Sequence, residues 1–449
     1  MSSPLIMKDL LGQFRGNGLK ARAMRAGVWT VIGYGASQAL RLASNLILAR
    51  ILFPSDFGIM ALVSLVLQGV SLFSDIGIGS SIIQNKRGDD PTFLNTAWTM
   101  QVVRGLVLTI IILILAWPIS VLYAQPILFQ LLAVAGLTSL ISGFNPTKLF
   151  SARRHITLGR ITVLELLTQA VSLAVMIALA LATKSVWALV IGGLTAAIFK
   201  VIFSNILLSG VKNSFVWHTD SVRQLFSFGG WIFLSSCLGF FVSQGDRIVL
   251  STIMTMDQLG VYSIASMLAA LILTVNSRVS DSVLFPIYSR KQNLTNDKLL
   301  PNIRQARIYI GTALLLPACG LIVFGDLVVG FLYDARYREA GWMLQVLVFG
   351  HSVLIATNIG PFYLAQGKSQ LFFSLILVKS LILIIAMSIG GKMAGVNGIV
   401  IAVAVSNLIY YPVQIYVYRR FGLWIWRLDV GFGCVICISG IIAVWRSFL

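Results

Sequence analysis

GVWTVIGYGASQALRLASNLILAR, residues 27–50, is long and apolar enough to cross a membrane, yet it carries Arg41 near its middle and Arg50 at its end. A membrane-spanning helix needs about 20 mostly apolar residues. The rest of the 449-residue chain has the same character, with 57% hydrophobic and 11% charged residues, whereas soluble proteins have about 25% charged residues. We therefore expect an integral membrane protein.

Apolar runs of this length recur along the whole chain and predict thirteen membrane spans. Each span should be a helix, because lipid offers no partner for backbone N–H and C=O groups. The alternating strand pattern of a membrane barrel does not occur in the sequence. The predicted spans are 26–50, 57–80, 97–117, 124–143, 161–183, 186–209, 227–250, 258–280, 305–325, 341–364, 369–390, 395–417 and 429–446.

The net charge of +19 comes from an uneven distribution of 34 basic residues between alternate loops. Most of them fall in the segments that lie on the same side of the membrane as the amino terminus. Cytoplasmic loops are the ones that carry an excess of Lys and Arg, so we expect a cytoplasmic amino terminus. The basic loops then face anionic lipid, and no nucleic-acid partner is needed to explain them.

The chain contains an internal repeat at an offset of 202 residues, which places Gly27-Val28-Trp29 over Gly229-Gly230-Trp231. At the same offset, Pro54 to Gly58 fall over Met256 to Gly260. Because the offset covers an even number of spans, the two copies should have the same orientation. The repeat predicts a cytoplasmic segment 1–25, an amino-terminal lobe 26–209, a linker 210–226, a carboxy-terminal lobe 227–418 and an extra helix in 419–449.

Charged residues inside predicted spans indicate a polar cavity, because a charge at the bilayer centre costs several kcal/mol unless it faces a protein interior or water. Arg104 and Lys379 are two such residues. In the first span, Gln38, Arg41 and Asn45 recur at helical spacing on one face. The seventh span repeats this pattern, with Ser243 and Arg247 at the equivalent positions. We expect these seven residues to line a central cleft, with one arginine of the stripe from each lobe.

Two segments carry a family resemblance. The run ARILFPSDFGIMALVSLVLQGVSLFSDIGIGSSIIQ, residues 49–84, resembles the amino-terminal signature of the polysaccharide transport family of the multidrug/oligosaccharidyl-lipid/polysaccharide (MOP) exporter superfamily. The run GDRIVLSTIMTMDQLGVYSIA, residues 245–265, is similar to the second-lobe motif of that family. The resemblance covers about residues 20–420. The family includes exporters of colanic-acid and teichuronic-acid type. The chain departs from the common fourteen-helix pattern by showing thirteen spans.

The resemblance implies an all-α polytopic membrane protein of the bacterial inner membrane, with about 12–14 transmembrane helices in two parallel six-helix lobes around a central cleft. It also implies a flippase. Its substrate would be an undecaprenyl-pyrophosphate-linked oligosaccharide, moved to the periplasmic leaflet for O-antigen, capsule or exopolysaccharide synthesis. Arginine suits such a substrate because it binds phosphate or carboxylate with two hydrogen bonds. A polysaccharide polymerase or export machinery is an expected partner, and Glu165 or Asp246 could couple transport to an ion.

Other functions fit the sequence less well. A multidrug or ion antiporter of the same superfamily would need an acidic cavity, and a membrane glycosyltransferase would need clustered carboxylates at an interfacial loop. No P-loop motif occurs in the sequence, so we do not expect ATP hydrolysis through a P-loop. We expect a transporter that is not an enzyme and has no cofactor. Cys434 and Cys437 are interpreted as buried apolar residues, and the dispersed histidines predict no metal site. We expect Asp246 to anchor a neighbouring helix, and Glu165 to pair with Arg160 or with a cation of the cavity.

Overall fold

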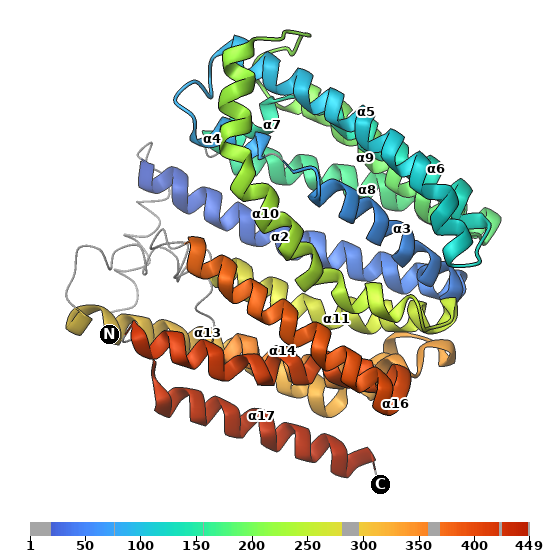
Figure 1. Ribbon diagram of the computed structural model, residues 1–449, viewed down its shortest axis with the longest axis vertical. Coiled ribbons are helices and arrows are strands. Elements are labelled where there is room, and N and C mark those ends of the chain that lie inside the picture. Colours follow the sequence, from blue (N-terminus) through green and yellow to red (C-terminus); the bar gives the residue numbers. More distant parts are fainter. Residues whose placement is uncertain are drawn as a thin grey trace, which may run out of the picture. The chain divides into compact units, whose positions relative to one another are not determined.

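The computed structural model describes residues 19–75, 77–155, 157–280, 296–357, 369–421 and 424–447, and in this part of the chain the regular elements are all helical (Figure 1). The chain divides into two compact units. The amino-terminal unit comprises the described residues up to Leu52 together with Leu62–Cys237. The carboxy-terminal unit comprises Phe53–Ala61 and the described residues from Leu238 onwards. Two helices, α3 and α10, therefore belong partly to each unit.

The amino-terminal unit is a bundle of long apolar helices with two short ones between them. The main packing pairs are α5 with α6, α8 with α9, α2 with α8, and α6 with α9. The helices are α2 (Leu19–Ile51), α3 (Pro54–Leu72), α4 (Ile78–Gln84), α5 (Pro91–Leu122), α6 (Ile127–Gly143), α7 (Lys148–Arg154), α8 (Leu158–Thr183), α9 (Trp187–Leu207) and α10 (Thr219–Leu250).

Small residues allow α5 and α6 to approach closely. A Cβ atom on Gly105 would lie 2.7 Å from the carbonyl oxygen of Ser139, and one on Gly143 would lie 3.0 Å from that of Gln101. Thr109 donates its hydroxyl hydrogen to the carbonyl oxygen of Gly136 across the same contact, at 3.0 Å. Small residues at helix contacts are the usual way for membrane helices to gain packing energy, since lipid supplies no hydrophobic force between them.

The short helix α4 interrupts the predicted span 57–80, so the prediction of one continuous helix there was wrong. Helix α3 ends at Leu72 and α4 starts at Ile78. Between them, Gly77 adopts a left-handed conformation with φ of 66°, which glycine reaches without steric cost. The carboxylate of Asp75 accepts a hydrogen bond from the Gly77 backbone N–H at 2.9 Å and holds this turn.

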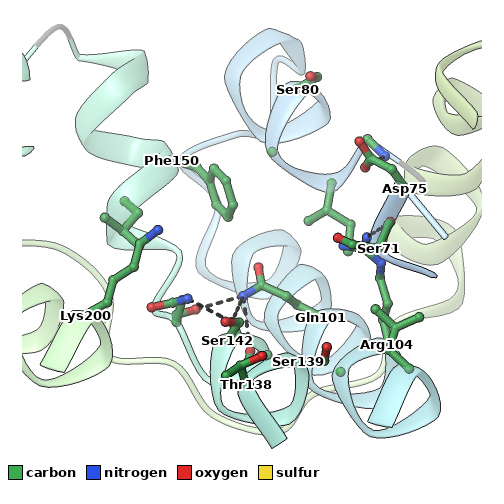
Figure 2. Close-up of a pocket in the computed structure, with 18 of the residues that line it drawn as sticks. Ser71, Asp75, Ser80, Gln101, Arg104, Thr138, Ser139, Ser142, Phe150 and Lys200 are labelled. Atoms are coloured by element: carbon green, nitrogen blue, oxygen red, sulfur yellow. Dashed lines mark hydrogen bonds between the residues drawn. The ribbon is translucent and has the colours of Figure 1, made fainter. Parts of the chain in front are cut away.

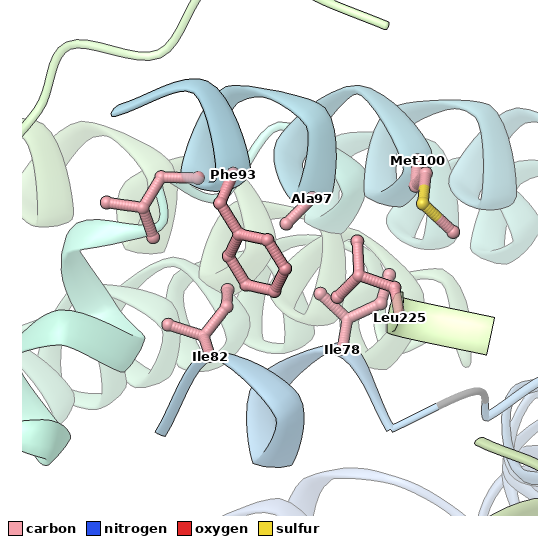
Figure 3. Packing of buried hydrophobic residues seen from close by; sticks show 7 residues of the cluster. Ile78, Ile82, Phe93, Ala97, Met100 and Leu225 are labelled. Atoms are coloured by element: carbon pink, nitrogen blue, oxygen red, sulfur yellow. The ribbon is translucent and has the colours of Figure 1, made fainter. Parts of the chain in front are cut away.

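The start of α10 is packed into the amino-terminal unit. The side chain of Leu225 is fully buried against Ile78 and Ile82 of α4 and Phe93 of α5 (Figure 3). The preceding strap, residues 208–218, is held by the side chain of Asn213, which accepts a hydrogen bond from the Thr147 backbone N–H at 2.9 Å. Burial of such apolar side chains contributes about 1.5–3 kcal/mol each, so this end of α10 is firmly attached to α4 and α5.

The carboxy-terminal unit packs α14 against α11, α13 and α16, and packs α17 against α13 and α14. Besides the start of α3 and the end of α10, its elements are α11 (Met256–Val279), α13 (Asn296–Leu332), the 3₁₀ turn η3 (Ala335–Tyr337), α14 (Ala340–Thr357), α16 (Ser369–Arg420) and α17 (Trp426–Ser447). The long α16 is broken by non-helical residues at Ala394 and Gly395. Lys379 and Tyr410 lie on opposite sides of this break, and Nζ of Lys379 is 5.8 Å from the centre of the Tyr410 ring. The two halves of α16 therefore run antiparallel, as the predicted spans 369–390 and 395–417 require.

Two glycines at equivalent positions of the internal repeat make reciprocal contacts in the carboxy-terminal unit. A Cβ atom on Gly58 would lie 1.9 Å from the carbonyl oxygen of Met256, and one on Gly260 would lie 1.8 Å from that of Pro54. The repeat aligns Pro54 with Met256 and Gly58 with Gly260. Equivalent residues that contact each other in this exchanged way are the expected result of a local two-fold relation between the starts of α3 and α11.

The thirteen predicted spans all overlap helices, although residues 358–364 of the tenth lie outside the described residues. In the described part of the chain, eight helices are long and apolar enough to cross a membrane, or nine if α6 and α7, which are bent by 59°, form one broken span. The last helix is attached at both ends, because Arg307 of α13 pairs with Asp429 at 2.7 Å and Arg446 pairs with Asp326 of α13 at 2.5 Å. Helix α17 is therefore a packed part of its unit.

Candidate functional site

A cavity of about 750 Å³ opens inside the amino-terminal unit. We call it the amino-unit cavity. It is lined by parts of α3, α4, α5, α6, α7, α8 and α9, and by the turn between α3 and α4 (Figure 2). Its volume falls in the range of about 300–1,000 Å³ that is typical of small-molecule sites. Its polar and charged lining residues include Gln68, Ser71, Asp75, Gln101, Arg104, Asn145, Arg153, Glu165 and Lys200.

Gln101 of α5 joins the wall of the cavity to the end of α6. Its Nε2 donates to the carbonyl oxygens of Ser142, Gly143 and Asn145, at 3.1, 3.1 and 3.2 Å. Ser142 and Gly143 belong to the last turn of α6 and Asn145 to the turn after it. The last turn of a helix leaves its C=O groups without the usual intrahelical donors. Since the nitrogen is used here, the amide oxygen of Gln101 must point the other way, and Figure 2 shows it directed into the cavity.

The lining contains three cations and two carboxylates, but most of them already have partners. Arg104 donates to the hydroxyl oxygen of Ser74 at 3.1 Å and to the carbonyl oxygen of Ser71 at 2.8 Å. Arg153 lies 3.7 Å from Glu165, and both side chains are about half exposed. Lys200 of α9 is the third cation, and within the described residues its side-chain ammonium forms neither a hydrogen bond nor an ion pair.

Arg154 fixes the α4–α7 end of the cavity. Its Nη1 donates to three carbonyl oxygens at the end of α4, those of Ile82, Ile83 and Asn85, at 3.1, 2.8 and 2.8 Å. Its Nε also donates to Asp89 at 3.0 Å. A cation at a helix carboxyl end is favourable because that end carries partial negative charge. Arg154 therefore holds α4 and α7, which both line the cavity, in a fixed relation.

Asp89 lies in the loop after α4 and contacts both Arg154 and His155. Its carboxylate contacts Nε2 of His155 at 2.9 Å as well as Arg154. Slight burial would raise the pKa of Asp89, but the hydrogen bond and charge of His155 and the charge of Arg154 outweigh it, so the pKa of Asp89 is lowered. The charged form of Asp89 is thus favoured in the folded chain.

Arg104 and Glu165, two of the predicted site residues, line this cavity. The alternative that Glu165 pairs with Arg160 was wrong, because Glu165 contacts Arg153 and Arg160 is instead 3.5 Å from the hydroxyl of Ser209. The role of Arg104 in substrate binding and that of Glu165 in ion coupling stay predictions.

The polar stripe of α2 lies outside the amino-unit cavity. Arg41 is exposed within its unit, and Asn45 and Gln38 are half-buried. Next to them, Ser37 donates to Gln169 of α8 at 2.6 Å, so this side of α2 packs on α8. The buried Oε1 of Gln38 has no hydrogen-bond partner in the described part of the chain. We expect Arg41 and Arg247 to line a common central cleft. Because Arg41 belongs to the amino-terminal unit and Arg247 to the carboxy-terminal unit, this cleft stays a prediction.

The remaining predicted residues lie in the carboxy-terminal unit and have local partners. Asp246 accepts a hydrogen bond from the Tyr262 hydroxyl of α11, which confirms its role as a helix anchor. Arg247 donates to Gln244 at 3.4 Å, and Ser243 donates to a backbone carbonyl one turn earlier. Lys379 lies over the ring of Tyr410. Transport roles for these residues stay predictions.

Cys434 and Cys437 are exposed on α17, so their interpretation as buried residues was wrong. They lie three residues apart on one side of the helix. In the described residues there is no group of three or more His, Cys, Asp or Glu side chains that could hold a metal ion.

Sequence reasoning missed Lys200, Arg153, Gln101 and Phe150 as cavity residues. Lys200 was visible as a charge inside a span, but the choice among such charges favoured the repeat-related arginines. Arg153 lies between the predicted spans 124–143 and 161–183, and in the structure it is the next-to-last residue of α7. Nothing in the sequence marks Gln101 or Phe150, because their position in the cavity depends on how α5, α6 and α7 pack.

Comparisons with known proteins agree with this architecture. The chain is 22% identical to the lipopolysaccharide biosynthesis protein WzxC of Escherichia coli, over 91% of this chain and 85% of the relative. It is 20% identical to the succinoglycan biosynthesis transport protein ExoT of Rhizobium meliloti, over 78% of this chain and 71% of the relative.

Among solved structures, the fold is similar to that of the lipid II flippase MurJ in an inward closed conformation. The TM-score is 0.69 at 16% identity, and the match covers 94% of this chain and 92% of MurJ. This likeness shows that the two chains share a fold. Residues 47–341, more than half of the chain, match the profile of the polysaccharide biosynthesis protein family. The chain therefore belongs to the polysaccharide biosynthesis protein family.

Proposed function

We propose that the protein is a flippase that moves a lipid-linked oligosaccharide from one leaflet of the membrane to the other during polysaccharide synthesis. The observation that carries this proposal is the amino-unit cavity, a polar and charged space inside a bundle of apolar helices. Such a space can take a hydrophilic head group out of water while the lipid tail stays among the apolar helix surfaces. Relatives named as polysaccharide transport proteins and a lipid II flippase support the same activity.

The chemistry of the lining suits an oligosaccharide with a negative charge. Hydroxyl and amide groups from Ser71, Gln101 and Asn145 can exchange hydrogen bonds with sugar hydroxyls. Arg104 and Lys200 can attract a phosphate or carboxylate, and charge attraction is stronger inside a low-dielectric bundle than in water. A drug antiporter of the same fold would favour an acidic cavity for cationic substrates, whereas this lining has three cations and two carboxylates.

The finer assignment follows from the sequence. The substrate would be linked to undecaprenyl pyrophosphate and would move from the cytoplasmic to the periplasmic leaflet of a bacterial inner membrane, with the amino terminus in the cytoplasm. A polysaccharide polymerase or export machinery would take the product. Of the two proposed ion-coupling carboxylates, Glu165 has the stronger support because it lines the amino-unit cavity, whereas Asp246 is engaged by Tyr262.

Loss of the gene tests this function in the cell. We expect the lipid-linked oligosaccharide to accumulate on the cytoplasmic leaflet and surface polysaccharide to disappear. Restored wild-type protein should reverse both effects, and Arg104→Ala should not. Lys392→Ala is the matched control, because Lys392 is an exposed basic residue of α16 outside the cavity. Normal surface polysaccharide together with altered drug sensitivity in the null strain would overturn the proposal in favour of an antiporter.

A further inference from the structure

We infer that the amino-unit cavity contains a subsite for one anionic sugar ring, formed by Phe150, Gln101, Asn145 and Lys200. This inference rests on the proposed function and adds to it the class of sugar that the cavity selects. The four residues come from α7, α5, the turn after α6, and α9, and all of them line the same cavity. Figure 2 shows Phe150, Gln101 and Lys200 around one open region.

Two amide oxygens in this region need hydrogen-bond donors. The side chain of Asn145 is 7% exposed. Its Nδ2 donates to the carbonyl oxygen of Ser142 at 3.0 Å, and its Oδ1 is buried with no partner among the described residues. Oε1 of Gln101 is in the same condition. A buried acceptor without a donor is unfavourable, and sugar hydroxyls are donors that can satisfy acceptors such as these.

Phe150 provides an apolar surface next to these acceptors. The ring is held at its edge by α4, since a Cβ atom on Gly79 would lie 2.6 Å from Cε1 of Phe150. It is only partly buried and is directed into the cavity (Figure 2). An aromatic ring presents a flat apolar face, and the C–H side of a sugar ring is the part of a saccharide that can cover such a face. The hydroxyl groups at the sugar edge would then reach Gln101.

Lys200 supplies the charge selection. Arg104 and Arg153 are held by Ser71, Ser74 and Glu165, whereas the side-chain ammonium of Lys200 forms neither a hydrogen bond nor an ion pair within the described residues. Glu165 attracts it only at longer range. A lysine ammonium is a compact point charge that attracts a single anionic group without a fixed orientation. A carboxylate or phosphate on the sugar ring fits this cation, and a neutral sugar leaves it unpaired.

Ligand protection of a thiol in the cavity tests the subsite on the full purified chain. Ser139 lines the cavity, so Ser139→Cys in a background without the native cysteines gives a thiol whose reaction with a maleimide can be timed. The probes are a methyl glucuronide, the matching neutral methyl glucoside, a sugar phosphate and inorganic pyrophosphate. We expect both anionic sugars to protect at concentrations about tenfold lower than the neutral one, as a charged hydrogen bond predicts.

Variants separate the parts of the subsite. Lys200→Gln should remove the difference between the glucuronide and the glucoside, and Gln101→Leu should weaken protection by both. Lys392→Ala should change neither. Equal protection by the neutral and anionic sugars in the parent chain would overturn the inference, and so would protection by pyrophosphate alone, which would assign Lys200 to the lipid linker. Either result would overturn the subsite but not the proposed function, provided that the chain still flips lipid-linked oligosaccharide. The proposed function fails only if flipping itself is absent.

Discussion

The buried ion pair between α13 and α17 makes a prediction that can be worked out in detail. Arg307 and Asp429 have side chains only 1% and 2% exposed, and Nη2 of Arg307 lies 2.7 Å from Oδ1 of Asp429. The same nitrogen donates to the carbonyl oxygen of Ala356 at 2.9 Å. Asp429→Leu would leave the guanidinium buried without its counter-charge, which typically costs about 3–5 kcal/mol.

Arg307 and Asp429 do not use all of their hydrogen-bonding atoms. This decides the expected stability of a variant in which both residues are replaced. Within the described residues, Nε and Nη1 of Arg307 and Oδ2 of Asp429 have no hydrogen-bond partner. When hydrogen-bonding atoms of a buried pair lack partners, the attraction between the two charges offsets little of the cost of removing them from water. Replacing both residues by apolar residues of similar size then often leaves the free energy of unfolding unchanged or raises it. We therefore expect the double variant Arg307→Met with Asp429→Leu to be at least as stable as the parent chain.

The assay is unfolding of the purified chain in mixed micelles, with rising SDS and tryptophan fluorescence as the signal. The parent, both single variants and the double variant form a cycle that gives the coupling between the two residues. We expect both single variants to unfold at lower SDS and the double variant to recover. A stable Asp429→Leu variant, or a double variant as unstable as the single ones, would refute the reasoning.

Three further predictions concern local packing and charge. Gly260→Ala brings a Cβ atom 1.8 Å from a backbone oxygen of α3 and should destabilise the chain by about 1–3 kcal/mol, whereas Gly320→Ala, which meets nothing within 4 Å, should not; equal SDS midpoints would contradict this. Arg154→Ala should speed amide hydrogen exchange at the end of α4, and unchanged exchange there would exclude its capping role. Because the pKa of Asp89 is lowered in the folded chain, its stabilising effect is present above about pH 4 and is lost as the pH falls. The free energy of unfolding should fall by less than about 1 kcal/mol on acidification, because Asp89 and His155 form an exposed pair. His155→Ala should make this fall smaller.

Helices were predictable from the sequence because apolar runs of span length have only one stable structure in lipid. The break at Gly395 was also predictable, since the polar and glycine-containing stretch 390–395 separates two apolar runs. The end of α3 at Leu72 was not, because residues 73–80 remain apolar enough to continue a span. That end depends on the left-handed Gly77 and on the Asp75 side chain that holds it.

The candidate site was predictable only in part. A charge inside a span indicates a polar environment, and two of the charges selected in this way, Arg104 and Glu165, line the amino-unit cavity. This reasoning could not distinguish the environment of Arg41 from that of Lys200, because seven helices contribute to the amino-unit cavity and their contacts are tertiary. In the sequence, Gln101 is an ordinary residue of a predicted span and Phe150 lies between two predicted spans. Their importance arises from the carbonyl groups and the glycine against which they pack.

The central claim is that this chain moves a lipid-linked oligosaccharide between leaflets through a cationic cavity. The most direct measurement uses vesicles that contain the purified chain and a fluorescent lipid-linked oligosaccharide, with a membrane-impermeant quencher outside. The account predicts that the wild-type chain and Lys392→Ala exchange the lipid between leaflets, and that Arg104→Ala slows this exchange strongly. Exchange no faster than in protein-free vesicles, or equal exchange by Arg104→Ala and wild type, would contradict it.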